Sequence, residues 1–445
     1  MLQRATVSPQ PLQSSEASNK HRGIVAIPVM MQFLIGLLLT SFLRISVQTK
    51  TNQQIERTHV LKGSIQHLSS RMDISKQSRM SDDYVHEVIF VIKQKNMEEL
   101  TRFLHDVSDP QSANYGQHMT GTAVSHLTYN SQGRESLLEY LHSTGATVVT
   151  ETLGGEYITA SAPIPVWERM FSCEFFMFHQ TQKNEITKRV VRTESYSIPV
   201  CLDNHVESVF GTVELPRENL STLRSAMIDP DNEKFDLQAT DYISPTKLRA
   251  AYNMGTSTGS DSSTQAVYAS LDQYFSPSDL SQFQTSFGIN QQAVSTSIGD
   301  HESYSACING TNCFGNLITQ YIIAASPISP TTYLYTDMST FSDWLVLVAN
   351  TQKPALVLII AYGIDEAGVS YAERDAFNTQ AIKLGVMGVT IVVASGDNGA
   401  VSARGLDRCY YAPTFPASSP YVTAVGATLV SLRVWYDMIC ENQVN

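Results

Sequence analysis

The sequence lacks the short motifs of several common enzyme classes. No HExxH zinc-protease motif, no P-loop and no GxGxxG dinucleotide fingerprint occurs in the chain. No histidine follows His301, so the rest of the chain holds no imidazole for a histidine-based catalytic triad. A zinc protease, a nucleotide-dependent enzyme and a histidine-dependent hydrolase are therefore disfavoured.

Positive charge is also scarce. Lys and Arg number 30 against 42 Asp and Glu, which gives a net charge of −12. No basic stripe of the kind that binds a phosphate backbone is visible, so nucleic acid is not an expected partner. Apolar material is plentiful instead. Hydrophobic residues make up 42% of the 445 residues and charged residues 16%, a balance typical of globular proteins with two or more domains.

Cysteine is sparse as well. The six cysteines include no CxxC pair, which disfavours a zinc knuckle or a thioredoxin-like redox motif. Cys307 and Cys313 bracket a short polar loop and could form a local disulfide in an oxidising compartment, with two free buried thiols as the alternative. Glycosylation sequons begin at Asn219 and Asn309, and they count only if the chain is secreted.

A long uncharged run near the N-terminus indicates the compartment. Residues 23–43 follow Lys20 and Arg22, carry no charge and end before Arg44. The run is about 20 residues long, enough to span a bilayer, and the basic residues before it favour an N-inside orientation. The sequence thus predicts entry into the secretory pathway by a signal anchor or a cleaved signal peptide. The expected destination is membrane-anchored, lysosomal, vacuolar or extracellular.

Composition shifts divide the chain into segments. A polar tail, residues 1–22, precedes the apolar run, and residues 44–81 are expected to form a solvated linker. Residues 82–215 mix helical and strand patterns, which is typical of an α+β domain. Residues 216–243 are polar and predict an exposed connector that is prone to proteolysis. Residues 244–445 alternate strands with helices.

Individual elements can be read from hydrophobic periodicity. In the α+β segment the pattern predicts a helix over 133–143, a hairpin turning at Gly154-Gly155 and a helix over 165–171. In the later segment, 355–362 and 389–394 are apolar runs typical of parallel strands that are covered on both faces. Strands that alternate with helices in this way predict a doubly wound parallel sheet.

A glycine-rich turn, Ser395-Gly-Asp-Asn-Gly399, follows the last of these runs. Ligand sites in open α/β sheets form at the carboxyl ends of the strands. Gly396 and Gly399 would allow a sharp turn with close backbone approach, and Asp397 could face a ligand. Taken alone, such a motif is more often an ordinary turn than a site.

Four separated stretches favour a functional site at this turn over an ordinary turn. They are residues 108–120 (SDPQSANYGQHMT), 245–253 (PTKLRAAYN), 388–399 (GVTIVVASGDNG) and 415–427 (FPASSPYVTAVGA). Together they resemble the sedolisins, the serine-carboxyl peptidases that include tripeptidyl-peptidases and kumamolisin. The first stretch is similar to the hallmark of the family's activation propeptide, and the second to the start of its mature domain. All four occur in the family's order.

The resemblance implies an α/β fold, as an incomplete subtilisin-like doubly wound parallel sheet preceded by an α+β, ferredoxin-like propeptide domain. Family chemistry uses a serine nucleophile, a glutamate base, an aspartate that orients the glutamate, and a second aspartate in the oxyanion hole. Asp397 matches that oxyanion aspartate, within the turn formed by Ser395, Gly396 and Gly399. The implied partners are a peptide or protein substrate and the chain's own propeptide.

The remaining catalytic positions of the family are not matched. The family's glutamate and orienting aspartate lie four residues apart on one helix, so both face the cleft. Here the glutamate position holds Phe314 and the aspartate position holds Ile318, and neither side chain can take a proton. The Gly255-Thr-Ser257 triplet is expected to be a turn rather than the nucleophile segment. The family's calcium site would lie in a missing C-terminal part, so no cofactor and no metal ligand are expected.

Three interpretations stay open from the sequence. The first is a sedolisin-family peptidase, a tripeptidyl-peptidase or endopeptidase by resemblance, that is inactive in this chain. The second is a non-catalytic peptide-binding or regulatory homologue. The third is a truncated product of alternative splicing or of a gene-model error, which would account for the missing serine but not for Phe314 and Ile318.

Overall fold

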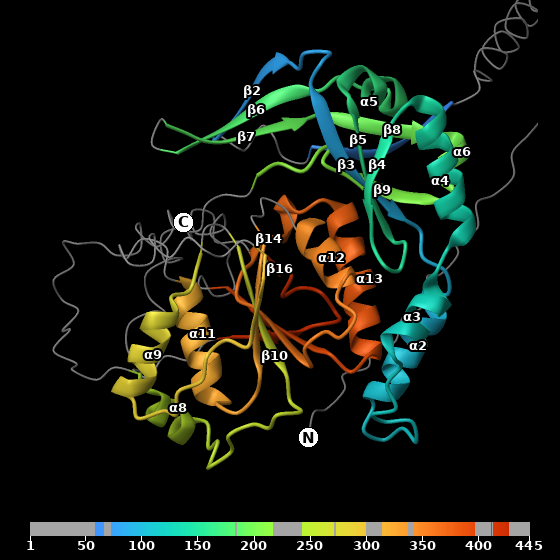
Figure 1. Ribbon diagram of the computed structural model, residues 1–445. Coiled ribbons are helices and arrows are strands. Elements are labelled where there is room, and N and C mark those ends of the chain that lie inside the picture. Colours follow the sequence, from blue (N-terminus) through green and yellow to red (C-terminus); the bar gives the residue numbers. More distant parts are fainter. Residues whose placement is uncertain are drawn as a thin grey trace, which may run out of the picture. The chain divides into compact units, whose positions relative to one another are not determined.

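The computed structural model describes residues 58–65, 73–182, 185–216, 243–270, 273–299, 314–336, 342–396, 411 and 413–426. All of them belong to one compact unit, Thr58–Asn445. We call residues 58–216 the N-terminal module and residues 243–426 the α/β module (Figure 1). The apolar run at 23–43 lies outside the described residues. Among the helices that are described, none combines the length and the apolar character needed to cross a bilayer.

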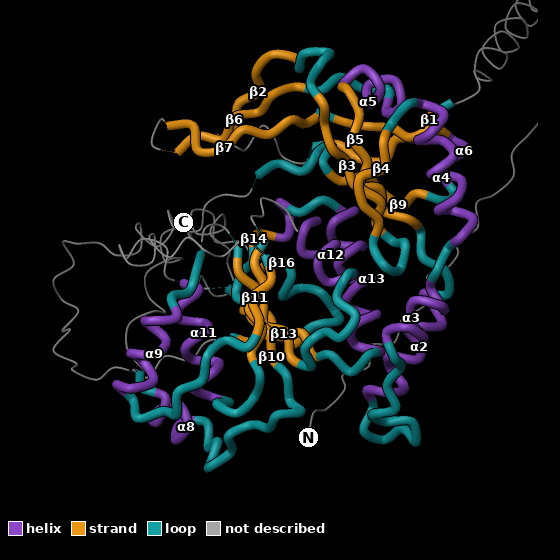
Figure 2. The backbone as a smooth tube through the Cα atoms, in the orientation of Figure 1, coloured by secondary structure: helices purple, strands orange, loops and turns teal. Residues whose placement is uncertain are grey.

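The described strands of the N-terminal module pair in an antiparallel manner. Figure 2 draws them in orange. Their bounds are β1 His59–Ser64, β2 Ile74–Arg79, β3 Val85–Ile92, β4 Thr147–Glu151, β5 Tyr157–Pro163, β6 Phe176–Gln182, β7 Glu185–Arg192, β8 Ser195–Pro199 and β9 Val206–Phe210. The orders are β4-β5-β3-β9, β2-β6-β7 and β1-β8. β4 and β5 form the hairpin predicted at Gly154-Gly155, and Gly155 has a φ of +67° that suits glycine.

The core of this module lies between β3 and a short helix. Helices α4 Ser131–Thr144, α5 Ile164–Phe171 and α6 Val200–Asp203 complete the module. Alternate residues of β3 point to the same face, so Val88 and Phe90 are both buried against α5. On α5, Trp167 and Phe171 stack with ring centroids 5.5 Å apart. The buried indole Nε1 of Trp167 is satisfied, because it donates a hydrogen bond to the carbonyl of His86.

Two strands occupy part of the range 44–81, where the sequence predicted a solvated linker. β1 pairs with β8 from His59 opposite Pro199 onward, and β2 pairs with β6. The linker prediction is therefore wrong for these two segments. Their sequences, HVLKGS and ISKQSR, are short and largely polar, and in β2 every residue after Ile74 is exposed. Such segments carry little of the hydrophobic periodicity on which the prediction depended.

The stretch that resembles the propeptide hallmark connects α2 Met97–Ser108 to α3 Gly121–Thr128. The carboxylate of Asp106 accepts hydrogen bonds from Ser112 Oγ and from Asn114 Nδ2, so one aspartate of α2 fixes the turn that follows it. Gly116 has a φ of +75° at the end of that turn. At the start of α3, Thr120 Oγ1 accepts from the amide of Ala123 and acts as the N-cap.

The α/β module is built on a parallel sheet, as the alternation of strands and helices predicted. Its described strands are β10 Gln265–Ala269, β11 Thr296–Ile298, β12 Thr331–Tyr335, β13 Val357–Ile360, β15 Thr390–Ala394 and β17 Thr423–Val425. Their spatial order is β11-β12-β10-β13-β15-β17. The chain enters at β10, runs to one edge, returns beside β10 and then moves toward the other edge. The carboxyl ends of β10 and β13 thus flank the point where the winding direction reverses.

Helices cover both faces of this sheet (Figure 1). The described helices are α8 Pro245–Ala251, α9 Pro277–Ser286, α11 Phe314–Ala325, α12 Ser342–Ala349 and α13 Tyr371–Val386. α9 and α11 lie on one face, and α12 and α13 lie on the other. The capping box that opens α13 is complete, because Ser370 Oγ accepts from the amide of Glu373 while the Glu373 carboxylate accepts from the amide of Ser370.

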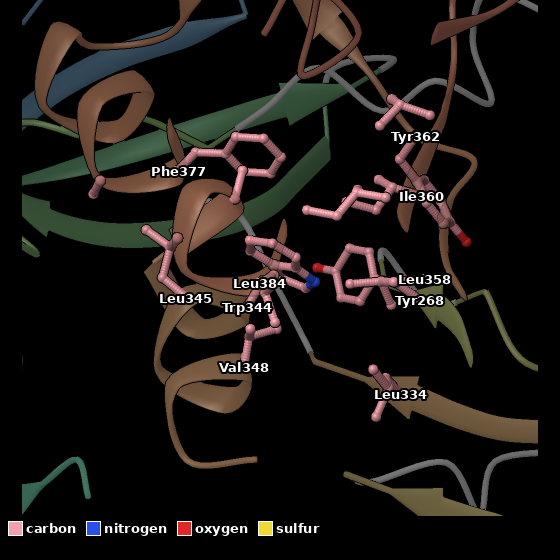
Figure 3. Close-up of a cluster of buried hydrophobic side chains, with 14 of the residues drawn as sticks. Tyr268, Leu334, Trp344, Leu345, Val348, Leu358, Ile360, Tyr362, Phe377 and Leu384 are labelled. Atoms are coloured by element: carbon pink, nitrogen blue, oxygen red, sulfur yellow. The ribbon is translucent and has the colours of Figure 1, made fainter. Parts of the chain in front are cut away.

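Aromatic side chains fill the space between the sheet and helices α12 and α13 (Figure 3). Trp344 of α12 and Phe377 of α13 stack with ring centroids 5.1 Å apart, and both are fully buried. Tyr268 of β10 packs edge-on against Trp344, with centroids 6.3 Å apart. Leu358 and Ile360 of β13 complete the same cluster. Burial of this much apolar surface is the main force that holds the α13 layer on the sheet.

Candidate functional site at the carboxyl edge of the sheet

The predicted site turn begins at the carboxyl end of β15. The amide of Ser395 donates to the carbonyl of Val425 in β17, 3.0 Å away, so the parallel pairing reaches the first residue of the turn. Gly396 has a φ of +98°, and a Cβ at this position would lie 3.1 Å from Oγ1 of Thr414. A residue with a side chain would be strained here, because its backbone would have to adopt a positive φ and its Cβ would crowd Thr414.

Several predicted site residues lie outside the described part of the chain, so the structure says nothing of them. They are the oxyanion candidate Asp397, Gly399 of the same turn, the disulfide candidates Cys307 and Cys313, and the sequon residues Asn219 and Asn309. Among the described residues, Cys173 and Cys201 are free thiols.

The helix on which the sequence predicted the two acid positions is α11. Its first turn is tied to α9, because Asn316 Oδ1 accepts from the amide of Ser276 and Asn316 Nδ2 donates to Asp279 Oδ2 at 2.7 Å. Gly315 allows close approach, since a Cβ there would lie 2.5 Å from the carbonyl oxygen of Tyr274. These contacts fix the rotation of α11 and hence the side that each of its residues presents.

Ile318 of α11 faces an apolar environment. It packs against the cluster under the sheet that contains Val267, Phe275, Tyr333 and Tyr335, and it also touches the main core of the module. The side chain is only partly exposed, so it serves as a packing residue between two hydrophobic clusters. The backbone of Phe314 opens α11, but its side chain lies outside the described residues. Ile318 thus contributes hydrocarbon to both clusters.

Three carboxylates of the α/β module make structural contacts. Asp279 accepts from Asn316, and Asp365 caps the 3-10 turn Glu366–Gly368 by accepting from the amide of Ala367. Glu366 forms an ion pair with Arg374 at 2.9 Å. Within the described ranges no group of three or more His, Cys, Asp or Glu side chains is placed to hold a metal ion.

The Gly255-Thr-Ser257 triplet is a turn, as the sequence predicted. The Arg249 guanidinium of α8 donates to the carbonyls of Gly255 and Ser257, and also to the carbonyl of Ala325 at the end of α11. Gly255 has a φ of +59°. Arg249 thus holds this turn against α11 through backbone oxygens.

A buried polar cluster in the N-terminal module was not predicted. Three side chains meet at Gly211, whose φ of +83° turns its amide and carbonyl toward different partners. Its carbonyl accepts from His86 Nε2 at 2.8 Å and from the Arg192 guanidinium, while its amide donates to Glu214 at 2.9 Å. Burial lowers the pKa of His86 to about 4, and the positive charge of Arg192 acts in the same direction. The residues lie far apart in sequence, so no local pattern could reveal the cluster.

A family model and curated relatives match this chain. The model described as "Pro-kumamolisin, activation domain" matches residues 73–215. Tripeptidyl-peptidase 1 of Homo sapiens is 30% identical over 357 residues, which cover 76% of this chain and 61% of the relative. Tripeptidyl-peptidase 1 of Dictyostelium discoideum is 29% identical over 380 residues, covering 77% of this chain and 62% of the relative. The chain therefore spans about three fifths of the length of these relatives.

Similar solved structures include a Pseudomonas sedolisin described as a serine-carboxyl proteinase. It is 24% identical with a TM-score of 0.32, over 41% of this chain and 52% of that chain. The epidermin leader peptide processing serine protease of Staphylococcus aureus is 12% identical with a TM-score of 0.36, over 78% of this chain and 70% of that chain. With the activation-domain match and the tripeptidyl-peptidase 1 relatives, this chain belongs to the sedolisin family as a tripeptidyl-peptidase-like precursor.

Proposed function

We propose that this chain is a sedolisin-family peptidase homologue that does not cleave peptides by the serine-carboxyl mechanism. The observation that carries the proposal is the packing of Ile318 between two apolar clusters, at the position of the family's orienting aspartate. The glutamate position, one helical turn earlier, is Phe314. A hydrocarbon side chain can neither accept a proton from a nucleophile nor orient a base that does. Asp397 alone could stabilise an oxyanion but could not generate the nucleophile.

The proposed role is a non-catalytic, regulatory homologue that handles peptides or peptidases of the secretory pathway. Residues 23–43 would bring it there as a signal anchor or a signal peptide, and no cofactor is needed for this role. The strand order of the α/β module supports a subtilisin-like arrangement as part of the proposal. A ferredoxin-like arrangement of the activation domain belongs to it as well. What favours binding over cleavage is that the activation domain is retained beside a site with two hydrocarbon side chains.

The experiment is an activity assay on the full chain, purified from a secretory expression host. Fluorogenic tripeptide amides and an unfolded protein would be incubated with it from acidic to neutral pH, with human tripeptidyl-peptidase 1 as the positive control. We expect product formation equal to that of an Asp397→Ala variant of the same chain. Turnover by the wild-type chain that disappears in Asp397→Ala would overturn the proposal.

The binding role has its own test. The full chain, immobilised, would be exposed to a library of unmodified peptides and to mature human tripeptidyl-peptidase 1. Saturable binding of either one supports a regulatory role. The absence of saturable binding to both would contradict it, whatever the outcome of the activity assay.

A further inference from the structure

One row of side chains crosses the parallel sheet on the side of α9 and α11. The register places five residues next to one another in neighbouring strands, with their side chains on the same face: Tyr333, Val267, Ile359, Val392 and Thr423. Tyr333 and Val267 are fully buried. Ile359 and Val392 are partly exposed, and Thr423 is exposed. The burial of this row therefore decreases from β12 and β10 toward β17.

The helical cover ends at the same point of the sheet. α9 and α11 lie on this face, and the buried cluster beneath them contains residues of β10 and β12 (Figure 1). Among the described residues, none from β13, β15 or β17 belongs to that cluster. On the opposite face the same strands are buried under α12 and α13, for example through Leu358 and Val393. Parallel strands are ordinarily covered on both faces, so one side of β13, β15 and β17 lacks a partner in the part of the chain that the structure describes.

This uncovered area, which we call the β13–β15–β17 face, is largely apolar. The side chains that form it share one side of three strands: Val357, Ile359, Thr390, Val392, Ala394, Thr423 and Val425. None of them is charged. Val425 is 48% exposed at the edge of the sheet. A contiguous apolar face of this kind is typical of a docking surface.

The sequence after β17 has the pattern of an amphipathic helix. Residues 427–445 lie outside the described residues, and residues 431–441 read SLRVWYDMICE. Large apolar and aromatic residues recur at helical spacing: Leu432, Trp435, Tyr436 and Ile439. The charged residues lie four apart on the opposite side: Arg433, Asp437 and Glu441. A strand would instead place Trp435 and Ile439 on the charged side, so the pattern favours a helix.

The length and the attachment point of this segment suit the β13–β15–β17 face. β17 ends with Val425 at the carboxyl edge of the sheet, beside the face itself. Residues 426–430 would connect it to the helix, a length common between a strand and a helix. A helix over 431–441 is about 16 Å long, and the five-residue strand β15 is also about 16 Å long. A helix that runs back from this edge can therefore cover the strands over their whole length.

From the uncovered face and this pattern we infer that residues 431–441 dock as a helix on the β13–β15–β17 face of the same chain. The apolar side of the helix, with Leu432 and Trp435, lies against Val392 and Val425, and its charged side faces water. The docked helix continues the layer that α9 and α11 begin, so the sheet is covered on both faces. This docking does not depend on whether the chain cleaves peptides.

A natural reporter allows the docking to be measured on the full chain. The sequence has three tryptophans, and Trp167 and Trp344 are both fully buried. Quenching of tryptophan fluorescence by acrylamide therefore reports chiefly on Trp435. The wild-type chain is expected to be quenched as weakly as a Trp435→Phe variant, which lacks the reporter. This protection should be the same at every protein concentration, because the helix and the face belong to one chain.

Two valines of nearly equal exposure provide a variant and its matched control. Val425→Lys places a charge on the β13–β15–β17 face, so it should release Trp435, with stronger quenching and emission shifted to the red. Val149→Lys makes the same change on β4 of the N-terminal module, at a position that is 47% exposed, and should leave Trp435 protected. Leu432→Glu alters only the segment and should release Trp435 as well. It replaces Val425→Lys if that variant does not fold.

Three results would overturn the inference. The first is strong quenching of Trp435 in the wild-type chain, which would leave the face free for another protein. The second is full protection of Trp435 in both Leu432→Glu and a folded Val425→Lys. The third is protection that disappears on dilution as a dimer dissociates in analytical ultracentrifugation, which would assign the face to a second copy of the chain.

Discussion

The imidazole of His86 donates a hydrogen bond of 2.8 Å from Nε2 to the carbonyl of Gly211, although 125 residues separate the two in sequence. His86 lies on β3 and is 9% exposed. The ring of Phe175 covers it at a centroid distance of 5.3 Å. Because a carbonyl only accepts, Nε2 must carry the proton in this contact. Burial and the positive charge of Arg192 both oppose a second proton on the ring, so the neutral form is favoured in the folded chain.

This burial predicts a loss of stability in acid. The pKa of His86 is lowered from 6.5 to about 4, first by burial and second by the charge of Arg192. The unfolded chain therefore binds a proton at this residue at a higher pH than the folded chain does. Stability from the neutral His86 is complete above pH 6.5 and is lost as the pH falls toward 4, by about 3 kcal/mol at most. Urea unfolding at several pH values measures this slope.

His86→Gln is the variant that tests the loss, because its amide can still donate to Gly211 and does not titrate. The variant should show a shallower fall in the free energy of unfolding over the same pH range. His126→Gln, at an exposed position of α3, serves as the matched control and should behave as the wild type does. Equal slopes in His86→Gln and the wild type would contradict the prediction.

The raised pKa of Glu214 leads to the opposite prediction for the dependence of stability on pH. Burial, followed by the negative charge of Glu373, raises its pKa from 4.5 to about 7, against the pull of Arg192 and of backbone amides. A raised carboxyl pKa means that the folded chain binds the proton more readily than the unfolded chain. Stability should therefore fall as the pH rises from 4.5 through 7, by up to about 3 kcal/mol.

Glu214→Gln keeps an oxygen that can accept from the amide of Gly211, and it removes the titration. Its unfolding free energy should exceed that of the wild type above pH 7 and lose this advantage in acid. Glu207→Gln, at an exposed position of β9, is the matched control. A Glu214→Gln protein that is less stable than the wild type above pH 7 would count against the raised pKa.

Much of the fold could be predicted from local sequence patterns. The apolar runs at 355–362 and 389–394 contain β13 and β15, and the Ser370–Glu373 capping box opens α13 as expected. Periodicity works here because each element is covered on a face that the pattern defines. It fails for β1 and β2, since their short polar sequences are strands only through pairing with distant partners. The activation-domain match starts at residue 73, nine residues before the boundary that the sequence predicted.

The site was less accessible to sequence reasoning than the fold. The family resemblance predicted two acid positions on the helix that is α11, because spacing within a helix fixes which residues share a side. The stretch 388–399 predicted the turn that begins at Ser395. The buried ion pair between Lys383 of α13 and Glu156 had no such signal, because 227 residues separate them. A search for helices with one apolar and one polar face also misses this contact, because the buried residues of α13 include polar ones such as Gln380. Long-range polar pairs of this kind follow from tertiary packing alone.

Replacing Phe377 tests how much the aromatic side chains between the sheet and α13 contribute to the free energy of unfolding. It is fully buried between Trp344, at 5.1 Å, and Phe415, at 5.2 Å between ring centroids. Phe377→Ala removes the ring and leaves a cavity, so it should lower the free energy of unfolding by about 3–5 kcal/mol. Urea unfolding of the full chain measures the loss. Tyr371→Ala, at a position of the same helix that is 71% exposed, should cost far less, and equal losses would disprove the layer's role.

The strongest test of the apolar role of Ile318 is to replace it with an acid. Ile318→Asp would place a carboxylate between two apolar clusters, so the α/β module should lose several kcal/mol of stability at neutral pH. The loss should shrink in acid, because a protonated carboxyl is cheaper to bury than a charged one. Leu317→Asp is the matched control, because Leu317 neighbours it on α11 and is 49% exposed. Thermal unfolding of both variants across pH compares them directly. If Ile318→Asp were as stable as Leu317→Asp at neutral pH, the position would be a solvated cleft wall that tolerates an acid, and the case for an inactive site would lose its main support.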